Sequence, residues 1–124
     1  MVDPRDVAEL AVRVLTSDEH AGRVLTLTGP RMLSVPRQAA VLGEALGRTL
    51  TTVEVPLATY RERLLAAGVE PAFVDVAVNG SRLVAAGGNA RLSDDVRLVL
   101  GRPPRTFAGW ARDHRHALDA GSPA

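Results

Sequence analysis

The 124-residue sequence contains two short segments with strand character, and no glycine-rich turn follows either of them. Residues 23–28 alternate, with Leu25 and Leu27 on one face, and residues 49–55 are rich in β-branched side chains. A strand followed by G-x-G-x-x-G places backbone N–H groups and a helix N-terminus on a pyrophosphate. Because that motif is missing and two strands make only a marginal sheet, the sequence predicts no dinucleotide-binding core and no bound cofactor.

Helical patterns account for most of the remaining sequence. Asp3 is a suitable N-cap before Pro4, and apolar residues then recur at helical spacing as far as Leu15. Further helices are expected at residues 34–47, 57–67, 70–87, 93–100 and 106–119. The expected fold is therefore α+β and helix-rich, with about six helices and two short strands. We expect one domain of residues 1–119 and a flexible tail of residues 120–124.

Composition excludes several classes of function. A net charge of +1 gives no overall attraction to nucleic acid or to an anionic membrane, and no apolar run is long enough to span a bilayer. The chain has no cysteine, so disulfides and thiolate catalysis are excluded. All 15 basic residues are arginine, so no lysine can form a Schiff base. We expect a cytoplasmic protein without a nucleic-acid or membrane partner.

The sequence resembles the C-terminal portion of the NmrA-like proteins, which are atypical relatives of the short-chain dehydrogenases/reductases. The resemblance covers roughly residues 2–118, and the passages that carry it occur in the family's order and spacing: Asp6-Val7-Ala8, residues 22–30, residues 34–48, Val53-Glu54-Val55-Pro56, Asp94-Asp95-Val96 and residues 101–107. In that family this region packs on a Rossmann domain, lines the substrate pocket and makes few cofactor contacts. The resemblance implies a substrate-side part of an oxidoreductase without its cofactor half.

No catalytic residue of that family is transferred to this chain. The Tyr-x-x-x-Lys pair of typical short-chain dehydrogenases is absent, because the only tyrosine is Tyr60 and Leu64 stands where the lysine would be. His114 and His116 would lie about 200° apart on a helix, so they are not expected to share a metal ion, and no metal site is predicted.

Aromatic residues are scarce, and they either fill the core or converge on a ligand pocket. Under the second interpretation, the pocket lies between the helices of residues 57–67 and 70–87, with the last helix nearby. His114 is either a hydrogen-bonded core or interface histidine, or a general base in an apolar pocket. The candidate ligand-binding residues are Tyr60, Phe73, Asp75, Asn79, Trp110 and His114.

Two functions remain open at the level of the sequence. The first is a module that binds a small apolar metabolite or a partner protein and is not redox-competent alone. The alternative is a small cofactor-independent enzyme, of the cyclase or isomerase type, in a biosynthetic pathway of secondary metabolism. Apolar helix faces that would rest on a Rossmann sheet need other cover, so a homodimer or a separate Rossmann-containing chain is expected as a partner.

Overall fold

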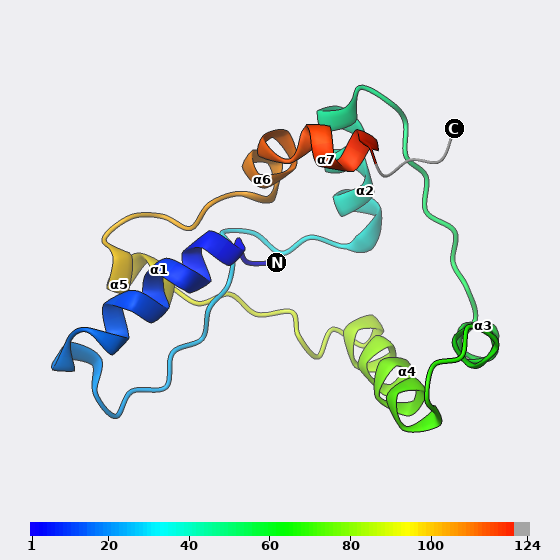
Figure 1. Ribbon diagram of the computed structural model, residues 1–124, viewed down its shortest axis with the longest axis horizontal. Coiled ribbons are helices and arrows are strands. Elements are labelled where there is room, and N and C mark those ends of the chain that lie inside the picture. The colour runs from blue at the N-terminus through cyan, green and yellow to red at the C-terminus, as the bar shows by residue number, and fades with distance from the viewer. Residues whose placement is uncertain (121–124) are drawn as a thin grey trace. The chain divides into compact units, whose positions relative to one another are not determined.

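The computed structural model describes residues 1–120, and within that range the chain is helical (Figure 1). Residues 121–124, to which most of the expected flexible tail belongs, lie outside the described residues. The elements of the described part are α1 (Pro4–Leu15), the short 3₁₀ helix η1 (Asp18–His20), α2 (Val35–Leu46), α3 (Leu57–Ala66), α4 (Pro71–Ala85), α5 (Asp95–Leu100), α6 (Phe107–Asp113) and α7 (Arg115–Ala120).

Side-chain caps fix where three of these helices begin, as their sequence signals predicted. The Asp3 carboxylate accepts the backbone N–H of Arg5 at 2.9 Å before α1. The Ser34 hydroxyl accepts a longer bond, of 3.4 Å, before α2, and the Thr106 hydroxyl accepts one of 3.0 Å before α6. Gly47 ends α2 in the left-handed conformation, with φ 67°, where a residue without Cβ carries no penalty.

The prediction of an α+β fold with two short strands is wrong, because residues 1–120 contain no strand. In residues 23–28, side chains take the place of a neighbouring strand. The backbone N–H of Thr26 donates to the Asp95 carboxylate at 2.7 Å, and the Thr28 hydroxyl accepts the backbone N–H of Ser93 at 3.1 Å. Residues 49–55 also have no regular secondary structure and are mostly exposed, so their β-branched side chains pack on no sheet.

The helix expected over residues 106–119 is two helices, α6 and α7, which raises the number of α-helices in the described chain to seven. They separate at His114, which follows the last residue of α6. The backbone N–H of His114 donates to the Trp110 carbonyl at 3.1 Å, and its ring Nδ1 lies 2.8 Å from the same oxygen. The side chain thus engages a carbonyl that a regular helix would reserve for the backbone.

The chain divides into two compact units. The first comprises residues 1–52 and those from 92 onward, and there α1 packs against α5 while α2 packs against α6 and α7. Its core contains Leu10, Val96 and Val99. The second unit comprises residues 53–91, in which α3 packs against α4. None of the described helices combines the length and the apolar character needed to cross a membrane.

Candidate functional site

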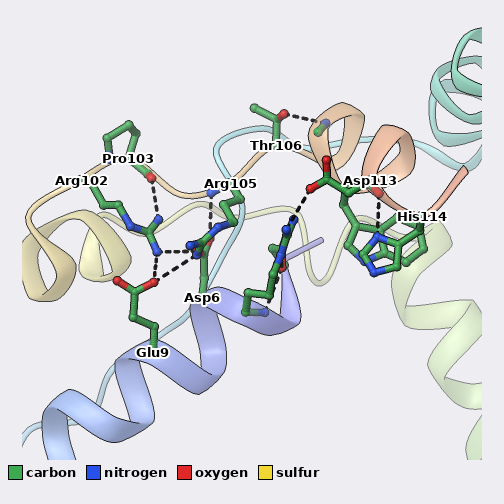
Figure 2. A network of polar contacts seen from close by, with 12 residues as sticks. Asp6, Glu9, Arg102, Pro103, Arg105, Thr106, Asp113 and His114 are labelled. Carbon is green, nitrogen blue, oxygen red and sulfur yellow. Dashed lines mark hydrogen bonds and ion pairs between the residues drawn. The ribbon is translucent and has the colours of Figure 1, made fainter.

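A buried carboxylate organises the beginning of α1. The Asp6 side chain has no exposed surface, and it receives the guanidinium groups of Arg102 and Arg105 from the loop between α5 and α6 (Figure 2). The Arg102 Nη2 donates to Asp6 Oδ1 at 2.9 Å, and the backbone N–H of Arg105 donates to Asp6 Oδ2 at 2.7 Å. Glu9, one helical turn further along, contacts both arginines at the surface. We call Asp6, Glu9, Arg102 and Arg105 the acid–arginine network.

The network keeps Asp6 ionised in spite of its burial. Burial raises the pKa of the Asp6 carboxyl group, but the backbone N–H of Arg105 and the guanidinium groups of Arg102 and Arg105 outweigh it, so the pKa lies below its ordinary value. The paired Arg102 and Arg105 side chains are 30% and 35% exposed, so water still reaches their outer faces. The network therefore fixes the loop at its Arg102 and Arg105 ends against α1.

Arg5 forms two further ion pairs, which join the beginning of α1 to the end of α6. The Arg5 guanidinium donates to the Asp3 carboxylate at 2.7 Å and to the Asp113 carboxylate at 2.8 Å (Figure 2). The hydrogen bond from the Arg5 side chain lowers the pKa of Asp3 to about 2, against the opposing effect of burial. Asp3 is thus a permanently charged carboxylate at neutral pH, occupied by its own cap and by Arg5.

A cavity lies beside the acid–arginine network, and Arg105 of the network is one of its lining residues. It has a volume of about 140 Å³, and its walls come from the N-terminal residues and from the start of α6. Val2, Pro4, Phe107 and Trp110 contribute apolar surface, and Asp3, Arg105 and Thr106 contribute polar groups. We call this space the aromatic cavity. An apolar space with a few convergent polar groups is the usual form of a small-molecule site.

Three rings stack along α6. The Phe107 and Trp110 rings are nearly parallel, with centroids 5.8 Å apart, and the Trp110 and His114 rings follow at 4.6 Å. Because the His114 ring stacks on Trp110 and its Nδ1 contacts the Trp110 carbonyl, its geometry is that of a helix-terminating, packed histidine. Stacking of this kind holds the indole in one orientation beside the cavity.

The structure places the six residues predicted for the ligand site on different units. Trp110 and His114 lie in the first unit and contact each other. The others lie in the second unit, and three of them are on α4. There Asp75 pairs with Arg61, the Asn79 amide oxygen accepts from Arg82 at 2.8 Å, and Phe73 is 66% exposed.

Within the second unit, these residues do not share one face. Asp75 and Asn79 are four residues apart and lie on the same side of α4, whereas Phe73 points in another direction. Tyr60 lies on α3 and is half-buried. That the six residues line a common pocket stays a prediction.

The sequence interpretation gave no role to Asp6, Arg102 or Arg105, although a signal was present. In Arg102-Pro103-Pro104-Arg105 the prolines restrict the backbone, so the two arginines start from a stiff segment of the chain. Pairing of this motif with a carboxylate in the first turn of a distant helix could be inferred only from the fold.

We tested whether the described residues could cradle the pyrophosphate of a dinucleotide. A cradle needs close-packed backbone N–H groups at a helix N-terminus that carries no negative charge. Here the N-terminus of α1 is occupied by the Asp3 carboxylate, and α4 is preceded by Glu70. The positive-φ glycine that lies closest before a helix is Gly68, and it closes α3. The N-termini of α1 and α4 therefore do not fit a dinucleotide phosphate, and residues 1–120 have no group of acidic or histidine side chains that could hold a metal ion.

No protein-family profile matches the chain. It is 34% identical over 117 residues to the (4-alkanoyl-5-oxo-2,5-dihydrofuran-3-yl)methyl phosphate reductase of Streptomyces griseus, covering 94% of this chain and 41% of the reductase. It is also 34% identical over 119 residues to the NAD(P)H azoreductase of Xenophilus azovorans, covering 96% of this chain and 42% of that enzyme. An uncharacterized oxidoreductase of Bacillus subtilis, YesF, is 29% identical over 113 residues, with 91% and 40% covered.

The chain thus spans about two fifths of the length of these relatives. What they share is oxidoreductase activity, and the name of one of them specifies NAD(P)H. The chain is therefore similar to one segment of these oxidoreductases.

Proposed function

We propose that this chain is the substrate-side segment of an NmrA-like, NAD(P)-dependent oxidoreductase. In this role it binds a small, largely apolar molecule and does not carry out the redox step by itself. The observation that carries the proposal is the aromatic cavity, in which Phe107 and Trp110 form an apolar wall beside a few polar groups.

The acid–arginine network supports this role because it holds the cavity wall in place. Arg105 and Thr106 belong both to the anchored loop and to the lining, and Phe107 begins α6 directly after them. A wall that is already ordered before binding loses little conformational entropy when a ligand arrives. The alkanoyl group in the name of the Streptomyces griseus reductase is an apolar substituent that such a wall would accommodate.

The cyclase or isomerase alternative gains less support from the geometry. A general base needs a pKa near the working pH. Asp3 is the carboxylate that lines the aromatic cavity, and its pKa of about 2 makes it a weak base. We therefore develop the binding role.

We further propose that α4 packs against a second copy of the chain. Phe73, Val76, Leu83 and Val84 are each at least half exposed. At 3.6 residues per turn, they lie within about 60° of the direction of Gly80, and Val74 and Val78 are buried on the opposite side.

This outer stripe is symmetric about Gly80, with Val76 four residues before it and Val84 four residues after it. An antiparallel pair of α4 helices crossing at Gly80 would place each Val76 against Val84 of the partner. Gly80 has open space around its Cα, so two backbones could approach closely there. A self-complementary surface of this kind is what a two-fold dimer requires.

The binding role is tested by the fluorescence of Trp110, the only tryptophan in the chain. Titration of the purified chain with 1-hexanol should give a saturable change in Trp110 emission, and Phe107→Leu should weaken it several-fold. Phe73→Leu, a matched change of an exposed phenylalanine in the second unit, should leave it unchanged. Absence of any saturable response, with a folded chain by circular dichroism, would reject the aromatic cavity as a binding site.

A further inference from the structure

A second cavity borders the aromatic cavity at the start of α2. It has a volume of about 260 Å³ and shares Met1, Thr106 and Phe107 with its neighbour. Leu33 and Val41 contribute apolar surface on its other side. Phe107 therefore lines both spaces, and an elongated small molecule lying along its ring would reach from one to the other.

The second cavity is cationic, because Arg31 and Arg37 both line it. Neither guanidinium group pairs with a carboxylate of residues 1–120. Arg105, which lines the aromatic cavity, is by contrast neutralised by Asp6 and Glu9. The uncompensated positive charge around the two adjacent cavities thus lies at the α2 end.

At the opposite end the charge of the Asp3 carboxylate is compensated, because Arg5 pairs with it at 2.7 Å. Asp3 lines the aromatic cavity and stays ionised, since its pKa is held at about 2 by Arg5. An anionic group would therefore find no compensating charge at the Asp3 end and would be attracted at the end of Arg31 and Arg37. The two ends therefore define the direction in which a charged amphiphilic molecule would lie.

We infer that the two adjacent cavities together bind an apolar molecule that carries a phosphate group. The apolar body rests on Phe107 and Trp110, and the phosphate lies between Arg31 and Arg37. This inference rests on the proposed binding role and adds the chemical class of the ligand. Planar guanidinium groups bind phosphate oxygens with paired hydrogen bonds, and two of them match the double charge of a phosphate monoester better than the single charge of a carboxylate.

The test compares three probes with the same six-carbon chain: hexyl phosphate, hexanoate and 1-hexanol. Each is titrated into the full chain and followed by Trp110 fluorescence at constant ionic strength. Hexyl phosphate should bind about tenfold more tightly than 1-hexanol, and hexanoate should fall between the two. Arg31→Gln and Arg37→Gln should each weaken hexyl phosphate several-fold and leave 1-hexanol unchanged.

Arg13→Gln is the matched control. Arg13 is exposed on α1, pairs with no carboxylate of residues 1–120 and lines neither cavity, so this change removes the same charge elsewhere. It should leave the affinity for hexyl phosphate unchanged.

The possible failures are distinguishable. Equal affinities for the three probes, or equal effects of the Arg13, Arg31 and Arg37 variants, would overturn the phosphate site while leaving the apolar site standing. Absence of binding by all three probes would overturn both the inference and the proposed function. Tighter binding of hexanoate than of hexyl phosphate would replace phosphate by carboxylate and reject the inference as stated.

Discussion

Replacing the buried carboxylate of Asp6 should destabilise the first unit strongly. Asp6→Asn keeps the size of the side chain but removes the charge that faces Arg102 and Arg105. It also allows an amide N–H₂ group to point at the backbone N–H of Arg105, which then has no acceptor.

The expected loss follows from the burial of the network. Removing one partner of a buried ion pair costs about 3–5 kcal/mol of unfolding free energy. The guanidinium groups of Arg102 and Arg105 are about one third exposed and can recover water, so we expect the lower end, about 3 kcal/mol. For a chain of this size the melting temperature should fall by roughly 10 °C.

Thermal unfolding followed by circular dichroism measures the effect, and Glu9→Gln is the matched control. Glu9 contacts the same two arginines, but its side chain is 45% exposed, so its loss should shift the melting temperature far less. If Asp6→Asn and Glu9→Gln were equally mild, the reasoning from burial would be refuted. The network would then be a surface feature without a structural role.

Four further outcomes are expected. Acidification should destabilise the chain between about pH 4 and pH 2, because Asp3 must bind a proton against its lowered pKa. Asp3→Asn keeps the helix cap, and in acid titrations it should weaken this dependence of stability on pH. Gly29→Ala should lower the melting temperature and weaken 1-hexanol binding, because a Cβ there would lie 2.0 Å from the Met1 carbonyl oxygen beside both cavities. Light scattering should report about twice the 13.1 kDa monomer mass, and Val76→Asp should return a monomer. Calorimetric titration with NADPH should show no binding, and a dissociation constant in the low micromolar range would contradict this.

Local signals in the sequence located the helices well. Asp3, Ser34 and Thr106 cap the helices that they were expected to cap, because a hydroxyl or carboxylate at that position satisfies a free N–H within its own turn. Strands depend on something that local sequence does not contain, namely a neighbouring strand. Instead of a neighbouring strand, residues 23–28 bond to the Asp95 carboxylate and, through Thr28, to Ser93. Their alternating pattern therefore predicted an extended backbone but not a sheet.

The candidate site was less accessible to sequence reasoning. Trp110 was selected for its ring, and the structure places it at a cavity. The polar residues that shape that region, Asp6 and Arg105, are 99 positions apart and meet only after α1 has packed on α5. The split of the last helix at His114 was also missed. Its ring contacts the Trp110 carbonyl in addition to the backbone N–H, and helical periodicity does not encode such a side-chain contact.

The proposed dimer and the missing phosphate cradle together constrain how redox chemistry could occur. A second copy would cover the Phe73–Val84 stripe of α4 but would bring the same sequence, which lacks a glycine-rich phosphate-binding turn. A homodimer of this chain therefore gains stability without gaining a cofactor site. A Rossmann-containing surface would supply both the cover and the cradle. Light scattering of the chain mixed with such a protein, with and without NADPH, should thus separate the two arrangements. Only the mixed complex should acquire nucleotide binding. Only formation of that complex should compete with the self-association that involves Val76.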